Sequence, residues 1–393
     1  MPRALRIKAC FVPKVATAVV VLALAACALA QVQAPTPAEA IALEQQGKLA
    51  EAEQAWQSVV LRNPRDANAL ASLGVVQSRE QKYSAAAASY RKALALKPKL
   101  PGVQLNLGLA EFKQGRFGGA IAPLSAALAA DPGSAQARTL LGLSCYGAKR
   151  FADAVEYLQP AAESDPGNIE LHQVLAQSCL WAKKYSCALD EFQNILQQNP
   201  DSPAAHMLTG EALDGLGRTA DAIAEFQAAA KTDPRDANVH FGLGYLYWES
   251  HQYDDAVREL QSALEIEPNH AQAAAYLGDI HFKRNDPDQA LPLLRKATQL
   301  KGDLRMAYLD MGAILSEQKH YSEAMAALKH AEKLDPAEAD AHFRLGRLYQ
   351  AMGDTAAAQK EFAKVRELHQ KADESIVQKM SAAPPALGTP AHP

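Results

Sequence analysis

Small and bulky apolar residues recur along this chain at a fixed interval of 34 residues. Alanine occupies one recurring position in ten successive segments: Ala52, Ala86, Ala120, Ala154, Ala188, Ala222, Ala256, Ala290, Ala324 and Ala358. A bulky apolar residue follows four places after each alanine, and a glycine or alanine stands twelve places before it. A strict period of this length is typical of a helix-turn-helix unit that stacks on copies of itself. The pattern therefore predicts an all-α chain with two helices in each segment.

Proline marks where most segments end. Eight prolines keep the same 34-residue interval: Pro64, Pro98, Pro132, Pro166, Pro200, Pro234, Pro268 and Pro336. Gly302 stands at the one place inside the series where the proline is missing. With proline numbered as position 32, ten units cover residues 33–372 and begin at Gln33, Ala67, Pro101, Ala135, Ile169, Pro203, Ala237, Ala271, Arg305 and Ala339.

The small residues at positions 8 and 20 of each unit indicate where two helices touch. A hydrogen or a methyl group lets two helix backbones approach closely, and a larger side chain would overpack the contact at about 1 to 3 kcal/mol. The bulky residue at position 24 is expected to fill the space beside that contact.

These positions resemble the tetratricopeptide repeat, which also has leucine at position 7 and alanine at position 27. Leucine fills position 7 in seven units: Leu73, Leu107, Leu141, Leu175, Leu243, Leu277 and Leu345. Alanine fills position 27 in seven: Ala93, Ala127, Ala161, Ala229, Ala263, Ala297 and Ala331. The resemblance implies an α-solenoid of about ten 34-residue repeats that form a right-handed superhelix. In that family the first helix of each pair, helix A, lines a concave groove, and helix B lies outside it.

The first thirty residues are typical of a secretory leader. Basic residues precede an apolar run from Val15 to Ala26, which is too short for a membrane span. Two processing routes remain open. One is signal-peptidase cleavage after Ala30, and the other is a bacterial lipobox in which Cys27 becomes lipidated. We expect a short linker at residues 31–36 and an exported protein of the periplasm or outer membrane, held at a membrane only through such a lipid anchor.

The other end of the chain changes composition after the last repeat. Residues 370–380 are expected to extend the last helix as a cap, because Ile376, Val377 and Met380 supply apolar side chains for the open end of the core. Residues 381–393 are rich in alanine and proline and are expected to be disordered.

Charge and cysteine content narrow the class of protein further. The net charge is −4, and loss of the basic leader would make it more negative, so a nucleic-acid partner is not expected. Three cysteines lie inside the repeats. Cys179 and Cys187 stand on either side of one predicted hairpin turn, within reach of a disulfide, and Cys145 is left free. The alternative is three buried thiols that act as small hydrophobic residues.

No catalytic or cofactor motif is present among the repeats. His172, His206 and His240 share position 4 of three consecutive units, but equivalent positions of stacked helix pairs lie roughly 10 Å apart, too far to share one metal ion. We interpret them as partly buried rings that replace the large residue expected there. Repeats occupy nearly the whole chain and leave no room for a catalytic domain. We therefore expect no enzyme activity, no cofactor and no metal.

Side chains at the groove-facing positions of helix A are the remaining signal. They include eight aromatic residues: Phe112, Tyr146, Trp181, Phe241, Tyr245, Trp248, Phe282 and Phe343. They also include six acidic ones: Glu211, Asp214, Glu249, Asp279, Asp310 and Glu317. Rigid rings beside polar groups are typical of peptide-binding surfaces. Two simpler interpretations stay open, namely that several rings pack between neighbouring hairpins and that the charges form a solvated face.

The sequence predicts a non-enzymatic interaction scaffold of the bacterial cell envelope. The groove would bind a segment of another protein or peptide, basic or amphipathic in character. The alternative is an envelope binding protein for a non-protein ligand such as a glycan, which would use the same rings.

Overall fold

The structure is a computed structural model that describes residues 34–382, with side chains up to Glu374. This part of the chain contains helices and no strand. The chain divides into two compact units, Met1–Asp165 and Pro166–Pro393, and each is described separately. The leader, Cys27 and the last eleven residues lie outside the described residues.

The N-terminal unit consists of four helix pairs. Even-numbered helices are the A helices and odd-numbered ones the B helices: α2 (Pro37–Gln45), α3 (Leu49–Arg62), α4 (Ala67–Arg79), α5 (Tyr83–Leu96), α6 (Val103–Lys113), α7 (Phe117–Ala130), α8 (Ala135–Gly147) and α9 (Phe151–Ser164).

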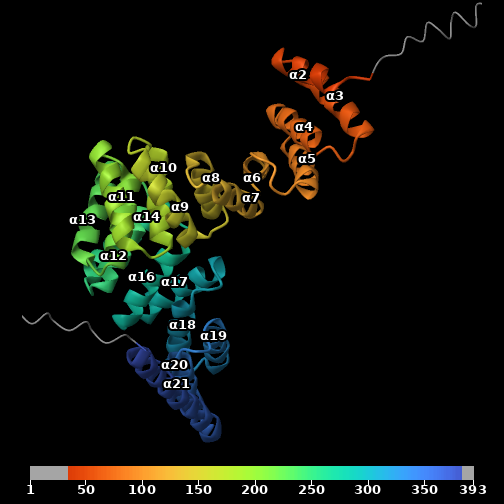
Figure 1. Cartoon of the computed structure of the whole chain (residues 1–393). Helices are drawn as coiled ribbons and strands as arrows, with labels where there is room; N and C mark the ends of the chain where they lie inside the picture. Colours follow the sequence, from red (N-terminus) through yellow and green to blue (C-terminus); the bar gives the residue numbers. More distant parts are fainter. Residues whose placement is uncertain (1–33, 383–393) are drawn as a thin grey trace, which may run out of the picture. The chain divides into compact units, whose positions relative to one another are not determined.

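The C-terminal unit continues the same alternation through six more pairs. Its helices are α10 (Ile169–Trp181), α11 (Tyr185–Gln198), α12 (Pro203–Gly215), α13 (Thr219–Thr232), α14 (Ala237–Glu249), α15 (Tyr253–Ile266), α16 (Ala271–Lys283), α17 (Pro287–Leu300), α18 (Arg305–Glu317), α19 (Tyr321–Leu334), α20 (Ala339–Met352) and α21 (Thr355–Ala382). Figure 1 shows the two members of each pair side by side, and each A helix contacts the B helix that follows it. The predicted all-α repeat fold is confirmed.

The A helices begin where polar side chains satisfy their first backbone N–H groups. Asp66, Ser134, Asn168 and Ser202 each stand directly before an A helix and accept a hydrogen bond from an N–H two or three residues later. Thr36 does the same for α2, with Glu39 bonding back to the Thr36 backbone. Each cap contributes about 1 kcal/mol, because these N–H groups have no partner within the helix.

The turn inside each hairpin has one conformation throughout the chain. Its position 15 residue lies in the left-handed region in all ten pairs: Gly47, Gln81, Gly115, Lys149, Lys183, Gly217, His251, Asn285, Lys319 and Gly353. The next residue then donates its N–H to the carbonyl five residues back, as Lys184 does to Cys179 at 2.8 Å. This is a Schellman ending, which fixes where helix A stops and how helix B departs.

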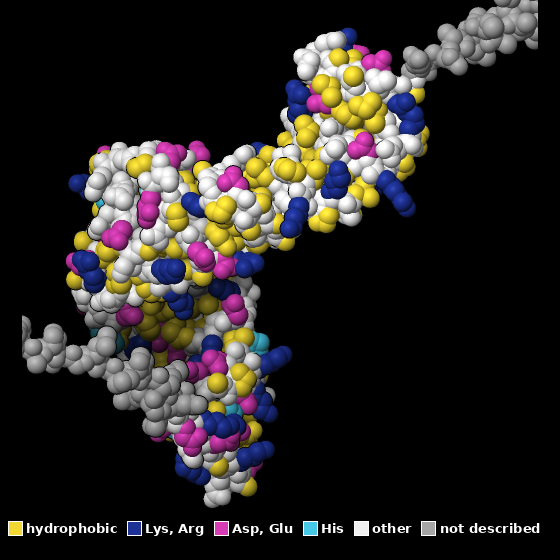
Figure 2. Space-filling view, viewed as in Figure 1, with side chains coloured by type: hydrophobic (Ala, Val, Ile, Leu, Met, Phe, Trp, Pro, Cys, Tyr) yellow, Lys and Arg dark blue, Asp and Glu magenta, His cyan; other side chains and the backbone are white. Residues whose placement is uncertain are grey.

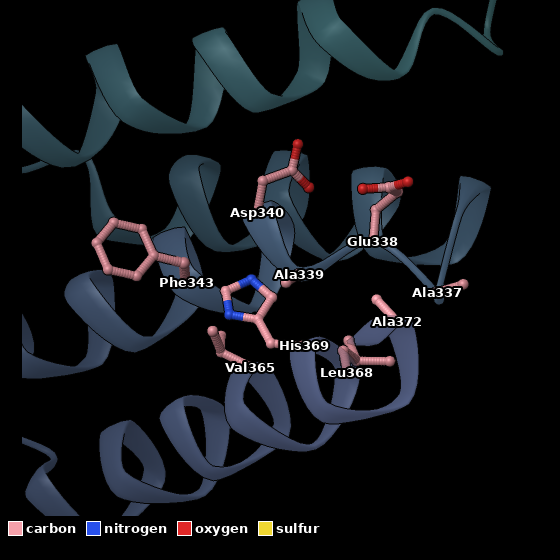
Figure 3. Close-up of a pocket in the computed structure, with 9 residues that line it drawn as sticks. All are labelled: Ala337, Glu338, Ala339, Asp340, Phe343, Val365, Leu368, His369 and Ala372. Atoms are coloured by element: carbon pink, nitrogen blue, oxygen red, sulfur yellow. The ribbon is translucent and has the colours of Figure 1, made fainter. Parts of the chain in front are cut away.

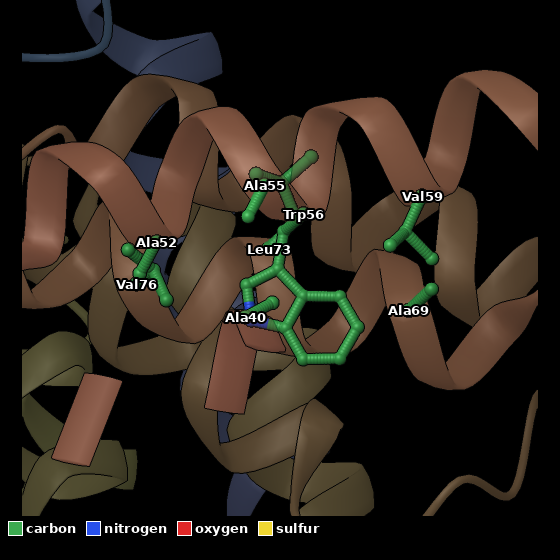
Figure 4. Close-up of a cluster of buried hydrophobic side chains, with 8 residues drawn as sticks. All are labelled: Ala40, Ala52, Ala55, Trp56, Val59, Ala69, Leu73 and Val76. Atoms are coloured by element: carbon green, nitrogen blue, oxygen red, sulfur yellow. The ribbon is translucent and has the colours of Figure 1, made fainter. Parts of the chain in front are cut away.

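The predicted helix contacts form the core. All ten position 20 alanines are essentially buried. A Cβ atom added to Gly74 would lie 2.5 Å from the Tyr90 ring, and one added to Gly142 would lie 2.5 Å from a Leu158 methyl carbon, so only glycine or a slightly shifted alanine fits position 8. Figure 4 shows how Trp56 fills the first such contact, against Ala40 and Ala69 of the neighbouring helices.

Cys179 at the end of α10 and Cys187 in α11 form a disulfide, with Cα atoms 5.8 Å apart. Cys145 is a free, buried thiol of the N-terminal unit. Helix α21 runs to Ala382, so it includes residues 370–380 and also the first two residues of the expected tail. None of the described helices is long and apolar enough to cross a membrane.

Candidate partner-binding face

The predicted groove residues fall in both units. In the N-terminal unit, Phe112 packs edge-on against Phe117 with ring centroids 5.5 Å apart, and Tyr146 lies 6.1 Å from Phe151. Phe112 also lines a pocket of about 390 Å³ together with Leu109 and residues of α8. The twelve other predicted residues belong to the C-terminal unit, where most of them contact one another.

Aromatic rings of α14 and α16 form one cluster in the C-terminal unit. The rings of Tyr245 and Trp248 stack with centroids 6.1 Å apart, and Tyr276 meets both edge-on. Phe241 continues the cluster, 5.9 Å from Tyr276 and 4.8 Å from His270. These rings do pack between neighbouring hairpins, as the simpler interpretation held. Sequence analysis missed Tyr276, because it lies one place after a groove-facing position of the repeat.

A chain of polar contacts, called here the ionic network, starts from this cluster. The indole Nε1 of Trp248 donates to Asp279 at 2.5 Å, and the Lys283 ammonium lies 2.7 Å from the same carboxylate. That ammonium also sits 4.5 Å from the centre of the Trp248 ring. Helices α14 and α16 are therefore joined by both charge and ring contacts.

The ionic network extends across α18 to α20. The Arg344 guanidinium lies 3.4 Å from Asp310 and 5.7 Å from the Phe282 ring, and it donates to the Leu309 carbonyl. Burial, and then repulsion from Asp279, raises the pKa of Asp310 to about 7. Its Oδ2 atom has no hydrogen-bond partner among the described residues. Asp310 is therefore held at a site that disfavours its charge.

Asp279 and Asp310 are not available to a partner in the way the sequence suggested. They are only 4% and 3% exposed, and each is paired with a basic side chain, Asp279 with Lys283 and Asp310 with Arg344. Helix position alone placed both acids on the groove. The basic side chains of Lys283 and Arg344 balance the charge of these two acids within the helix packing.

Three other predicted acids do lie at the surface, and we call Glu211, Asp214 and Glu249 the acidic wall. Burial and then the neighbouring Glu249 raise the pKa of Asp214 to about 6, and burial with Asp214 raises the pKa of Glu211. Solvent reaches Glu211, yet the surrounding protein removes much of its hydration. Burial, and then the charges of Glu249 and Asp214, raise the pKa of Tyr245 to about 12. No basic side chain pairs with the acidic wall in the described part of the chain.

A pocket of about 580 Å³ opens between α16, α18 and α20, and we call it the arginine pocket. Phe282, Gly312, Ala313, Leu328 and Ala351 supply an apolar lining, and Phe343 stands at its edge with 47% of its surface exposed. Its charged lining residues are Glu317, Asp340, Arg344 and Arg347. Figure 2 shows a hollow near α16 with hydrophobic and acidic side chains inside it.

Only two of these four charges are free. Asp340 pairs with Arg305, and Arg344 pairs with Asp310. Arg347 and Glu317 are exposed and form no ion pair or hydrogen bond with the described residues.

Phe343 also borders a second pocket, of about 430 Å³, where α20 meets α21. Figure 3 shows Val365, Leu368 and His369 of α21 facing Asp340 and Phe343 across it. Trp181, at the end of α10, is 51% exposed and lines neither pocket.

The position 4 histidines pair with glutamate within their own hairpins. The Nδ1 atoms of His172, His206, His240 and His342 lie 2.5 to 2.7 Å from Glu191, Glu225, Glu259 and Glu361, respectively. No group of residues suited to a metal ion occurs within the described residues. Sequence analysis missed these pairs, although the signal was present. In every unit with histidine at position 4, and in no other, position 23 is glutamate.

Stacked helix pairs with one set of repeated contacts define a helical-repeat protein. The particular family follows from the sequence: the tetratricopeptide repeat family matches residues 38–101, 105–169 and 241–303 in one form and residues 146–212, 182–243, 215–261 and 315–383 in another. The chain belongs to this family. Tetratricopeptide repeat proteins mediate protein–protein interactions, and their fold is typically a non-catalytic scaffold.

Several solved structures are similar to parts of the chain. YrrB, described as a TPR protein with an unusual peptide-binding site, is 21% identical, with a TM-score of 0.40 over 48% of this chain and 97% of its own. PilF of Pseudomonas aeruginosa is 20% identical, with a TM-score of 0.48 over 51% and 92%. MamA of Desulfovibrio magneticus RS-1 is 23% identical, with a TM-score of 0.40 over 44% and 97%. No curated protein matches the chain.

Proposed function

We propose that this chain is a non-enzymatic scaffold of the bacterial cell envelope that binds a segment of a partner protein along the A helices of the C-terminal unit. The observation that carries the proposal is the arginine pocket. It combines an apolar lining, an exposed aromatic ring and two unpaired charges, and three successive A helices contribute to it. Such a combination is typical of a site where a partner side chain becomes buried.

Export rests on the leader. A basic, then apolar, segment followed by small residues would direct the chain out of the cytoplasm, and lipidation at Cys27 would hold it at a membrane. Fractionation of cells that express the full chain or Cys27→Ser separates the two routes. Loss of membrane association in the variant supports a lipoprotein, and a soluble periplasmic pool in both supports cleavage after Ala30.

A protein segment is favoured over a glycan by the surroundings of Trp248. Sugar binding by aromatic residues needs an open ring face, whereas Lys283 lies over this ring and Asp279 holds its Nε1 atom. The ring and the Nε1 atom of Trp248 are therefore already engaged in contacts between α14 and α16.

Photo-crosslinking in cells tests the proposed site. A photoreactive phenylalanine analogue replaces Phe343, and the matched control carries it at Leu300, an exposed residue at the end of α17 that does not line the arginine pocket. We expect a discrete crosslinked protein from position 343 that is absent from position 300. Equal or absent crosslinking at both positions would place the binding surface elsewhere.

A further inference from the structure

Unpaired charges on the A helices of the C-terminal unit gather at two separate places. The acidic wall on α12 and α14 carries three carboxylates without a basic partner. The arginine pocket carries Arg347 on α20, a base without an acidic partner among the described residues, and the unpaired acid Glu317 on α18 opposes it. Lys283 on α16 and Arg344 in the pocket lining add no free base, because they are already paired with Asp279 and Asp310.

We propose that the segment bound by this face carries basic side chains over the acidic wall at one end, and at the other end a large apolar side chain, with an adjacent carboxylate, in the arginine pocket. The inference rests on the proposed function and specifies its partner. Opposite charges held apart on a surface select a matching order of charges and reject the wrong order.

The acidic wall attracts a base for a physical reason. Glu211 and Asp214 lie three residues apart on α12, and burial together with a neighbouring acid disfavours the charge of each. A lysine or arginine supplied by a partner relieves this repulsion without having to break an existing ion pair. An acid that already forms an ion pair within the protein would gain less from a partner's base, because its existing ion pair would have to break first.

The arginine pocket accepts an apolar side chain with an acid beside it. Ala313, Leu328 and Ala351 give the pocket an apolar lining, and the rings of Phe282 and Phe343 also border it. Arg347 at the pocket offers a planar fork of donors that suits a carboxylate. Glu317 is the one opposing charge, because Asp340 is neutralised by Arg305.

The helix order sets the length of the segment. Neighbouring packed helices lie about 8–10 Å apart, so the three steps from α14 to α20 span roughly 25 Å. An extended chain advances about 3.3–3.6 Å per residue, so roughly seven residues separate the basic end from the apolar side chain.

Designed peptides test this charge order against the full chain by fluorescence anisotropy. The matching peptide is Lys-Lys-Ser-Gly-Ala-Ser-Gly-Ala-Leu-Glu, and the control peptide has the same composition with the lysines moved next to Leu-Glu. We expect the matching peptide to bind at least about fivefold more tightly, and its advantage to shrink as salt is raised. Equal affinity for both peptides would refute the proposed spacing.

Two charge variants test the pocket end. Arg347→Glu is expected to weaken binding of the matching peptide by about fivefold or more. A peptide with lysine in place of the final glutamate should restore the affinity for this variant. Glu317→Gln is expected to strengthen binding of the matching peptide by a few fold, because it removes the opposing charge. Weaker binding by Glu317→Gln would mean that a base occupies this end, and the inference would be wrong.

The control variant is Lys329→Glu, which makes the same change of charge as Arg347→Glu at an exposed residue of α19 that does not line the pocket. It is expected to leave peptide affinity unchanged, and circular dichroism confirms that each variant is folded. Equal weakening by Lys329→Glu and Arg347→Glu would indicate a general charge effect and contradict the inference. If no peptide binds, the inference fails, whereas a specific crosslink at position 343 would still support the proposed function.

Discussion

Replacing Asp310 by asparagine tests whether ionisation of this buried carboxylate destabilises the fold. The side chain is 3% exposed, and burial with repulsion from Asp279 raises its pKa to about 7 from a usual value of 3.8. Because the folded-state pKa lies above the unfolded one, ionisation destabilises the fold. The cost is largest above pH 7 and disappears as the pH falls toward 4.

The magnitude follows from the two pKa values. A difference of about three units corresponds to roughly 4 kcal/mol at pH 8, as an upper limit. Asparagine removes this cost but leaves Arg344 without its carboxylate, and that side chain is partly hydrated. We therefore expect Asp310→Asn to stabilise the protein by about 1–3 kcal/mol at pH 8 and to have little effect at pH 5.

Urea unfolding followed by circular dichroism at pH 5, 6, 7 and 8 measures this difference. Hydrogen exchange of peptides from α18 and α20 provides a local readout, because repeat proteins often unfold in parts. Asp340→Asn is the matched control, since this acid on α20 is exposed and paired with Arg305. A variant Asp310→Asn that is less stable than the parent at pH 8, or that retains the parent's pH dependence, would refute the reasoning.

Three further predictions concern the repeat contacts. Gly142→Val should destabilise the N-terminal unit by about 1–3 kcal/mol, measured by urea unfolding, because Leu158 already fills that space; an unchanged midpoint would show that the contact can relax. His240→Ala should cost about 1–2 kcal/mol, since Glu259 loses its partner, and a double-mutant cycle with Glu259→Gln should show coupling; additive effects would contradict the pairing. Cys187→Ser should cost roughly 2–3 kcal/mol under oxidising conditions and nothing in dithiothreitol, whereas the same loss in both would mean that the disulfide does not stabilise the fold.

The stacking of the repeats could be predicted from sequence because it depends on size. Gly74 and Ala86 are small for one reason, which is that two backbones meet there, and Tyr90 is large because it fills the adjoining space. Each unit contacts chiefly its neighbours, so the residue size required at a position of one unit is also required at that position of the next. The period and the residue sizes were therefore enough to identify the fold.

The surface of the A helices was predicted less well because it depends on particular neighbours. Asp279 occupies a groove-facing position, yet its exposure was decided by Lys283, four residues later on the same helix. Asp310 is covered by Arg344 from the next pair, a contact that no pattern within one unit contains.

Turn geometry was missed for a different reason. Lysine and glutamine do not favour the left-handed conformation, so Gln81, Lys149 and Lys183 gave no sign of it. Glycine at 47, 115, 217 and 353 was the available signal, because it accepts this conformation at no steric cost.

The shared hairpin turn makes each 34-residue unit an interchangeable spacer. All ten hairpins end helix A at the same place and start helix B in the same way, so inserting or removing one whole unit leaves the joints on both sides intact. Such a change between α14 and α20 would move the acidic wall and the arginine pocket by one helix-pair step, roughly 10 Å. The distance between the two binding ends can thus change only in whole helix-pair steps, by duplication or deletion of a repeat within the gene. Point substitutions instead change which side chains each end recognises.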